Sequence, residues 1–274
     1  MCDSYKCNFT NYEAFFCTQH IKETYVYRRI STPTHPFPET REELETMIED
    51  EIKKYGNDAD LNHIDVSKIE DFSRLFKNSE FNGDISEWDV SNAKDMRAMF
   101  YDSEFDGDIS DWDVSNVTNM SSMFFNAKTF NQDLSGWDVH NVTDMFKMFC
   151  GTSFNGDIST WDVRNVTNMS CMFFYASSFN SNLKRWNTKN VKDMNGMFYR
   201  CESFSQDISR WDVSKVTDMS GMFEDAGSFN QDLSGWNVSK VENMSYMFCG
   251  ALKFNQDISG WNVSNAKNMS DMFC

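Results

Sequence analysis

The eight tryptophans of the chain recur at a nearly constant interval, and this interval constrains the fold more than any other feature of the sequence. Successive tryptophans are 24 or 25 residues apart, and each lies in a near copy of the phrase at residues 131–149. The tryptophans are Trp88, Trp112, Trp137, Trp161, Trp186, Trp211, Trp236 and Trp261. A fixed period of this length is typical of solenoids, in which each repeat packs only against its neighbours.

Two local patterns alternate within each repeat. Around Trp88 and Val90, apolar residues alternate with polar ones, which predicts a short β-strand with one buried face. Met96, Met99 and Phe100 then follow at positions i, i+3 and i+4, which predicts a single helical turn. The sequence therefore predicts an α/β repeat solenoid, a leucine-rich-repeat-like stack of short parallel strands with one helical turn per rung.

The chain is predicted to contain three parts. The solenoid is expected to occupy residues 61–274 in about nine rungs, because residues 61–76 keep every apolar position of the repeat although isoleucine replaces the tryptophan. A capping box at Thr40–Glu43 predicts a helix within residues 39–60 that caps the open end of the stack. A helix that binds a partner is the alternative. Residues 1–38 form a non-repeat segment that ends in a proline-rich connector.

The repeated tryptophans are interpreted as core residues rather than as ligand platforms. Their position alternates with polar positions, and Ile64 fills it in the first rung. Aspartate or asparagine stands before and after each predicted strand, where its side chain can hydrogen-bond the backbone of a turn. Calcium binding is the alternative for these residues, but it requires six or more converging oxygens.

The charge balance excludes several kinds of partner. A formal net charge of −17 and a pI near 4.6 argue against nucleic acid and against an anionic membrane surface. No apolar run approaches 18 residues, so no membrane insertion is expected. The N-terminus lacks the apolar region of a signal peptide, which favours a cytoplasmic or other intracellular location unless a leader is missing.

The eight cysteines are scattered and are expected to be reduced thiols. Cys249 and Cys274 are the exception, because they share one repeat position on adjacent copies and are expected to lie close enough to bridge on oxidation. No cofactor is expected. The alternative is a zinc site, although the spacings fit no standard finger, and its ligands would be Cys2, Cys7, Cys17 and His20.

A third acidic column is expected on the exposed strand face, directly after each tryptophan. Like charges on adjacent strands repel, so these carboxylates are either well solvated or neutralised by a partner. Basic residues stand beside them in the rungs of Trp161 to Trp211. We interpret this face as the candidate binding surface for a protein ligand, with a merely solvated face as the alternative. The candidate residues are Asp89, Asp113, Asp138, His140, Asp162, Arg164, Arg185, Asn187, Lys189, Arg210 and Asp212.

No catalytic constellation emerges from the sequence. The chain has four histidines, no glycine-rich phosphate loop and no His-Glu-x-x-His motif, so an enzyme is not expected.

The repeat phrase Phe-Asn-Gln-Asp-(Ile/Leu)-Ser-Gly-Trp-(Asp/Asn)-Val-Ser-Asn-Val-Thr-Asn-Met-Ser-x-Met-Phe resembles that of BspA-like leucine-rich-repeat surface proteins over about residues 61–274. The resemblance implies adhesion or protein–protein contact at a cell surface, and it supplies no catalytic residues. The sequence thus predicts a non-catalytic interaction or adhesion scaffold. The alternative is a structural element that stacks end to end as an oligomer through an uncapped C-terminal rung at Phe273 and Cys274.

Overall fold

The computed structural model describes residues 13–14, 27–28 and 37–274. The chain divides into two compact units, Met1–Phe37 and Pro38–Cys274. None of the described helical segments has the length and hydropathy that a membrane span requires.

The first unit contains one short pair of strands. Strand β1 (Glu13–Ala14) pairs antiparallel with β2 (Tyr27–Arg28). The zinc hypothesis falls outside the described residues, since it concerns Cys2, Cys7, Cys17 and His20.

The second unit opens with helix α1, which spans Arg41–Tyr55. Thr40 is the N-cap, and its hydroxyl accepts a hydrogen bond from the Glu43 N–H at 3.2 Å, which satisfies one of the free donors of the first turn. Gly56 ends the helix at φ 90°, and its N–H donates to the Ile52 carbonyl at 2.8 Å.

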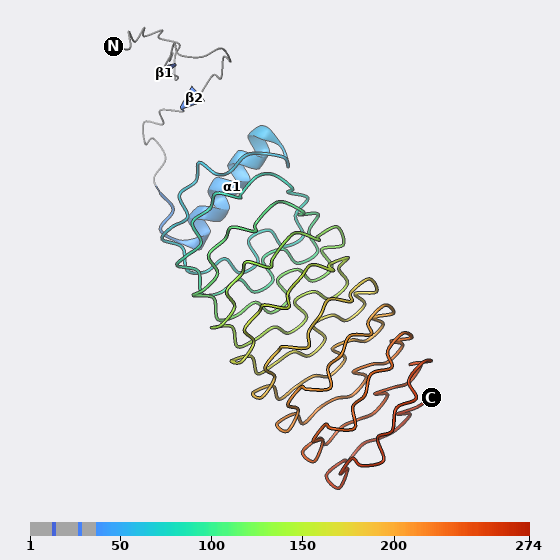
Figure 1. The fold of residues 1–274 in the computed structure, drawn as a ribbon. Coiled ribbons are helices and arrows are strands. Elements are labelled where there is room, and N and C mark those ends of the chain that lie inside the picture. The colour runs from blue at the N-terminus through green and yellow to red at the C-terminus, as the bar shows by residue number, and fades with distance from the viewer. Residues whose placement is uncertain (1–12, 15–26, 29–36) are drawn as a thin grey trace, which may run out of the picture. The chain divides into compact units, whose positions relative to one another are not determined.

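Helix α1 packs against the first repeats (Figure 1). Leu44 and Ile48 are buried in the same core cluster as the apolar side chains of the repeats. Arg41 Nε donates to the carbonyl of Ser73 at 2.7 Å, so the helix also binds a backbone acceptor of the first repeat. Burial and hydrogen bonding together hold α1 on this end of the stack.

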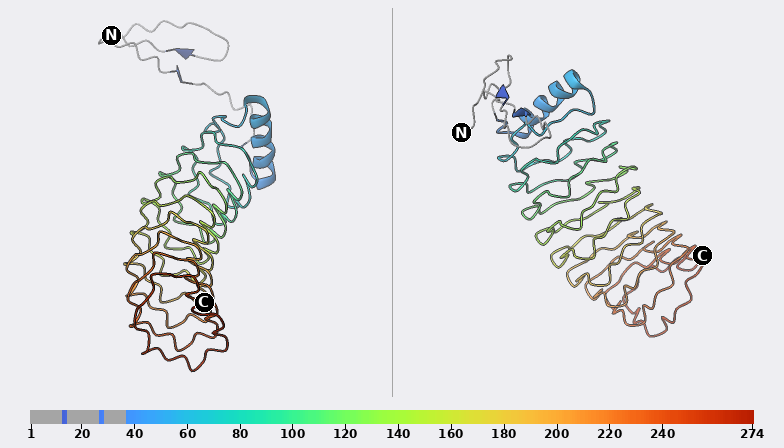
Figure 2. Two further views of the ribbon diagram at one scale, coloured as in Figure 1. Left: turned by 90° about the vertical axis from the view of Figure 1, so that its right-hand side faces the viewer. Right: turned by 45° about the horizontal axis from the view of Figure 1, so that its top comes forward.

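The repeats form a stack of coils, one coil to each repeat (Figures 1 and 2). One residue of each coil forms an isolated parallel β-bridge with the equivalent residue of the next coil. The residues bridged in this column are Asp71, Asp95, Asn119, Asp144, Asn168, Asp193, Asp218, Asn243 and Asn268, and one further parallel bridge joins Asp60 and Asp84.

The expected strand around each tryptophan is wrong. Among residues 37–274 the structure contains no β-strand, only isolated bridges. The backbone at Trp88 turns instead, and its N–H donates to the Ile85 carbonyl at 3.2 Å. Period-2 burial arises here because tight turns also place alternate side chains on opposite sides.

The expected helical turn is also absent, and the segment that replaces it carries the bonding between coils. The N–H groups of Met96, Ala98 and Phe100 donate to carbonyls of the next coil at 3.0, 2.9 and 2.8 Å. Ala98 has φ 55°, which an α-helical turn does not allow. Because Ala98 is left-handed, consecutive tight turns point every second N–H of this segment toward the next coil. We call this segment of each coil the ladder.

The left-handed position recurs before the Met-Phe pair of every coil, and it yields a prediction. Ser122 occupies it with φ 57°, whereas Gly196 and Gly221 fill it in later coils. A non-glycine residue loses roughly 1–2 kcal/mol there, and a β-branched residue more. We expect Ser122→Gly to stabilise the fold by up to about 1 kcal/mol, and Ser122→Val to destabilise it by at least about 1 kcal/mol.

Chemical denaturation followed by circular dichroism measures both effects. Lys128→Gly is the matched control, because Lys128 is exposed and is not left-handed. It is expected to lose about 0.5–1 kcal/mol, as glycine does in an ordinary conformation. A loss of stability in Ser122→Gly equal to that of the control would contradict the interpretation.

Asp193 and Asp218 stand next to each other in the bridged column, as Asp71 and Asp95 do at its start. Burial raises the pKa of Asp193 above its usual value, a hydrogen bond from the Asn195 N–H opposes the shift, and the charge of Asp218 adds to it. Stability from such a group is present below the unfolded pKa, about 4, and is lost as the pH rises through the folded pKa. We therefore expect Asp193→Asn to raise the unfolding midpoint at neutral pH.

This gain should vanish as the pH falls below about 4, where Asp193 is protonated in both states. Thermal melts across this pH range test the prediction. Asp144→Asn is the control, because Asp144 lies between Asn119 and Asn168 and its removal relieves no like-charge neighbour in the column. Equal gains in the two variants at neutral pH would contradict the explanation by burial and by the charge of Asp218.

The interior confirms the interpretation of the tryptophans as core residues. All eight indoles are buried, together with the columns of methionine and phenylalanine in the coils of Trp88 to Trp236. The indole N–H of each donates to a backbone carbonyl of the preceding coil, as Trp161 does to Leu134 at 3.0 Å. Each tryptophan thus joins two coils through both its ring and its polar atom.

The structure contains the bridge foreseen for the last two repeats. Cys249 and Cys274 form a disulfide whose Cα atoms are 4.5 Å apart. Among the described residues Cys150, Cys171 and Cys201 are free and buried. Burial raises the pKa of Cys150 to about 12, so this thiol stays protonated at neutral pH.

Candidate interaction surface

Three positions of each repeat define the candidate surface: the residue before the tryptophan, the residue after it, and the third residue after it. We call this surface the tryptophan-flanking face. The eleven residues expected to bind a partner all occupy these positions, and nine of them are exposed. His140 and Asp162 are half-buried. The tryptophan between the first two positions points into the core, which turns its neighbours outward.

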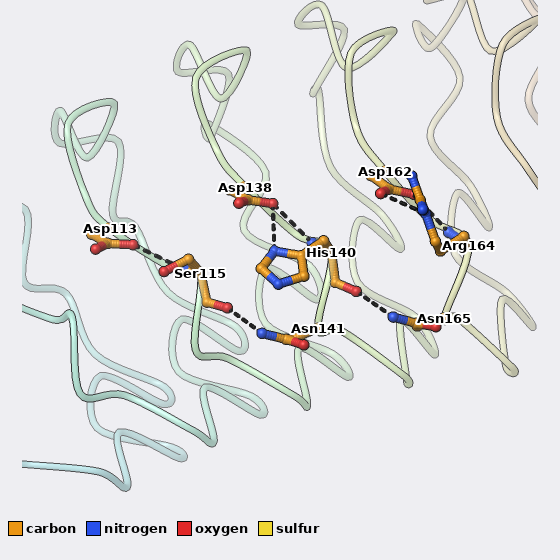
Figure 3. Close-up of polar contacts among 8 residues, drawn as sticks. All are labelled: Asp113, Ser115, Asp138, His140, Asn141, Asp162, Arg164 and Asn165. Carbon is orange, nitrogen blue, oxygen red and sulfur yellow. Dashed lines mark hydrogen bonds and ion pairs between the residues drawn. The ribbon is translucent and has the colours of Figure 1, made fainter.

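The aspartates after the tryptophans have a structural role that the sequence interpretation missed. Asp138 Oδ1 accepts a hydrogen bond from the His140 N–H at 3.1 Å and lies 2.8 Å from His140 Nδ1 (Figure 3). Asp113 accepts from the Ser115 N–H at 3.0 Å in the coil before it. Each carboxylate therefore closes a tight turn of its own coil, and no partner is needed to account for the column.

These hydrogen bonds favour the charged carboxylates. The pKa of Asp113 is held below its usual value by hydrogen bonds from the side chain and the backbone N–H of Ser115. The pKa of Asp162 is lowered first by the hydrogen bond from the Arg164 side chain, which lies at 2.8 Å (Figure 3). Asp113 and Asp162 are thus charged at any pH above the ordinary range of aspartate.

A column of asparagines lies alongside the aspartates, and each asparagine hydrogen-bonds its coil to the preceding one. Asn141 Nδ2 donates to the Ser115 carbonyl of the preceding coil at 2.8 Å, and Asn165 Nδ2 donates to the His140 carbonyl at 2.7 Å (Figure 3). Four further asparagines make the same bond, and they are Asn92, Asn116, Asn190 and Asn265. The repeated Asn before Val or Ala was the available signal, but only stacking shows which carbonyl it reaches.

Successive coils are further apart at the tryptophans than at the ladder. The ring centroids of Trp161 and Trp186 are 6.5 Å apart, whereas those of Phe173 and Phe198 in the ladder of the same coils are 5.7 Å apart. The wider spacing weakens the repulsion between aspartates of adjacent coils, because the interaction falls with distance. It also leaves room for longer side chains on this side.

A hollow opens on the face where the basic residues gather. We call it the basic hollow; its volume is about 680 Å³. Its lining residues are Asn182, Lys184, Arg185, Trp186, Asn187, Thr188, Arg210 and Asp212. It includes four of the predicted residues, Arg185, Asn187, Arg210 and Asp212, whereas Asp89 and Asp113 lie several coils away.

One coil departs from the repeat to make this hollow. Asn182 and Asn187 replace aspartates that the coils on either side carry at these positions, so the coil loses two negative charges. Thr188 replaces the buried valine, and its hydroxyl donates to the Asp212 carbonyl at 3.0 Å. The two asparagine substitutions remove carboxylates from a coil in which basic side chains are found, so both changes make the hollow less acidic.

The cations of the hollow differ in their contacts. Lys184 Nζ lies 2.7 Å from Asp207, and this contact is the first cause of the lowered pKa of that carboxyl. Arg185 and Arg210 form no ion pair with any described residue, and neither does Lys189 beside them. Three exposed cations are thus available for an external anion.

The described residues contain no group of three or more histidine, cysteine, aspartate or glutamate side chains placed to hold a metal ion. The tryptophan-flanking face therefore combines regular hydrogen bonds within and between coils with a local change from acidic to basic side chains.

No curated protein matches the chain. The family described as "Mycoplasma protein of unknown function, DUF285" matches three overlapping stretches, residues 42–153, 135–226 and 181–274. Since these stretches cover the chain from residue 42 to its last residue, well over half of its length, the protein belongs to this family.

Proposed function

We propose that the protein is a non-catalytic scaffold that binds a protein partner through the tryptophan-flanking face. The observation that supports this most directly is the basic hollow. Arg185 and Arg210 are exposed there without an internal carboxylate partner, on a chain whose net charge is −17. A rigid stack of coils holds these side chains in fixed relative positions, as a recognition surface requires.

The chemistry of the hollow favours an acidic protein segment. Guanidinium groups bind carboxylates through two parallel hydrogen bonds, which gives direction as well as affinity. The aspartates that surround the hollow disfavour an extended polyanion such as nucleic acid, whose charge would run across them. A short acidic segment meets the cations of the hollow and avoids the neighbouring carboxylates.

The finer assignment belongs to the same proposal. The stacked coils suit a solenoid, and the resemblance to BspA-like leucine-rich-repeat proteins supports adhesion as the biological use of the face. A repeat family of unknown function is compatible with an interaction role.

The test compares two double variants that change the net charge equally. Arg185→Glu with Arg210→Glu reverses the hollow, whereas Lys128→Glu with Lys253→Glu reverses two exposed lysines elsewhere that have no ion pair with a described residue. Immobilised protein is used to capture partners from an extract of the source cells. We expect the first variant to lose its specific partners and the second to keep them. Equal recovery by both variants would refute the proposal for this face.

A further inference from the structure

We propose that the tryptophan-flanking face pairs with the same face of a second copy of this chain, in antiparallel orientation about a two-fold axis. This inference rests on the proposed function, since it assigns a partner to the same surface. It is carried by the order of charges in the column of residues that directly precede the tryptophans.

This column reads from acidic to basic along six consecutive coils. Two acidic residues are followed by two uncharged residues and then by two basic ones. In order along the stack, the six residues are Glu87, Asp111, Gly136, Thr160, Arg185 and Arg210. Read from its other end, the column carries the opposite charge at each charged position. Two copies of the column in antiparallel orientation therefore place opposite charges against each other.

A two-fold axis between the coils of Gly136 and Thr160 uses this property. It sets Glu87 against the partner's Arg210 and Asp111 against the partner's Arg185, and each contact occurs twice, as in an isologous dimer. A parallel arrangement would place like charges opposite one another, at a cost of several kcal/mol. The charge order therefore selects the antiparallel pairing.

The four charged side chains are available for these contacts. Glu87, Asp111, Arg185 and Arg210 are all exposed. None of them forms an ion pair or a side-chain hydrogen bond with another described residue. By contrast, Lys94 pairs with a glutamate of the preceding coil at 2.6 Å, so neutralisation within the stack is available where the sequence provides it.

The centre of the column suits close approach. Gly136 has no side chain, and a Cβ placed there would meet only the Ser110 carbonyl at 3.7 Å. Thr160 is short, and its hydroxyl is already bound to the Ser135 carbonyl at 3.0 Å. The charged side chains at both ends are longer, so they reach across while the central backbones come together.

In the column that directly follows the tryptophans, the same axis places Asp113 opposite the partner's Asn187, but it also places Asp89 opposite the partner's Asp212 and Asp138 opposite the partner's Asp162. This column adds no attraction, so the pairing depends on the column that precedes the tryptophans. The basic hollow of one copy then receives the acidic end of the other. Two such contacts are made per dimer, one on each side of the axis.

The test exploits the symmetry of the column. Variant A is Glu87→Arg with Asp111→Arg, which makes both ends basic. Variant B is Arg185→Glu with Arg210→Glu, which makes both ends acidic. Light scattering coupled to gel filtration of the full chain at low salt should show a dimer for the wild type. A and B alone should dissociate at least tenfold more readily, because like charges then meet at both ends.

An equimolar mixture of A and B should restore a dimer that contains one chain of each. This complementation separates a lost contact from a folding defect, and circular dichroism of each variant checks the fold directly. The double variant Lys128→Glu with Lys253→Glu should remain dimeric, and added salt should weaken the wild-type dimer.

Two results would overturn the inference. One is a wild type that stays monomeric at every attainable concentration. The other is a dimer that neither A nor B weakens, which would place the contact elsewhere, for example at the C-terminal coil. A monomeric wild type whose captured partners still depend on Arg185 and Arg210 would overturn self-pairing alone and leave the proposed function standing.

Discussion

Trp161→Ala is expected to lower the free energy of unfolding by about 3–5 kcal/mol. Trp161 is 3% exposed, and its ring stacks between those of Trp137 at 6.4 Å and Trp186 at 6.5 Å. Its indole N–H also donates at 3.0 Å to the carbonyl of Leu134, which accepts a second hydrogen bond from the Trp137 N–H at 3.1 Å. The substitution therefore removes a large buried surface, leaves a cavity and breaks one hydrogen bond between adjacent coils.

The position of Trp161 in the middle of the stack increases the effect of the substitution on unfolding. Each coil packs only against its neighbours, so a weak central coil divides the stack into two shorter ones that unfold more independently. Denaturation followed by circular dichroism should show a lower midpoint and a broader transition. An unchanged midpoint would mean that the tryptophan column does not hold the coils together.

Two controls separate the contributions. Trp161→Phe keeps an aromatic ring and loses the hydrogen bond to Leu134, so it should lose less, with about 0.5–1.5 kcal/mol attributable to the lost hydrogen bond. Trp261→Ala alters the last coil, where the tryptophan is 9% exposed and has a tryptophan neighbour on one side only. It should cost less than Trp161→Ala and leave the transition of the central coils in place.

Removing the bond between Cys249 and Cys274 is expected to have the second largest effect, concentrated on the last coil. The bridge closes a loop of 25 residues, for which the loss of chain entropy in the opened state corresponds to about 3 kcal/mol. The last coil depends on this bridge because little else covers it. Val263 is 36% exposed, Met269 42% and Phe273 63%, although the equivalent residues of earlier coils are buried.

Hydrogen exchange measures this effect coil by coil. Under oxidising conditions, Cys274→Ser should increase the exchange of amides in the last coil by about two orders of magnitude, and central coils should be unaffected. A reducing agent should act on the wild type in the same way and should not change Cys274→Ser further. Exchange that is equal in wild type and variant under oxidising conditions would show that the disulfide does not secure the coil.

Several features of the fold could be predicted from the sequence because they depend on local rules. The helix at Arg41–Tyr55 follows from the cap at Thr40 and the stop at Gly56. Burial of the tryptophans follows from their alternation with polar residues, since an apolar ring must be covered wherever the backbone turns inward. Adjacency of Cys249 and Cys274 follows from the repeat period alone.

The conformation of each coil could not be predicted in the same way. A strand and a run of tight turns both place alternate residues inside, so the period around Trp88 does not distinguish them. Apolar residues at i, i+3 and i+4 fit a helical turn and also the ladder around Ala98. The choice depends on the sign of φ at Ala98, and this is set by the hydrogen bond from the Ala98 N–H to the Ser121 carbonyl in the next coil.

The same distinction between local rules and contacts between coils applies to the candidate surface. The sequence by itself determined the period, the inward residues and the columns that face outward, because these depend on the order of residues within one repeat. Only the tertiary structure decided that Asp113 bonds its own turn and that Arg185 and Arg210 share one hollow without an internal partner. Such contacts join residues of different coils or depend on the turn geometry, and both are fixed when the coils stack and each backbone N–H finds its carbonyl.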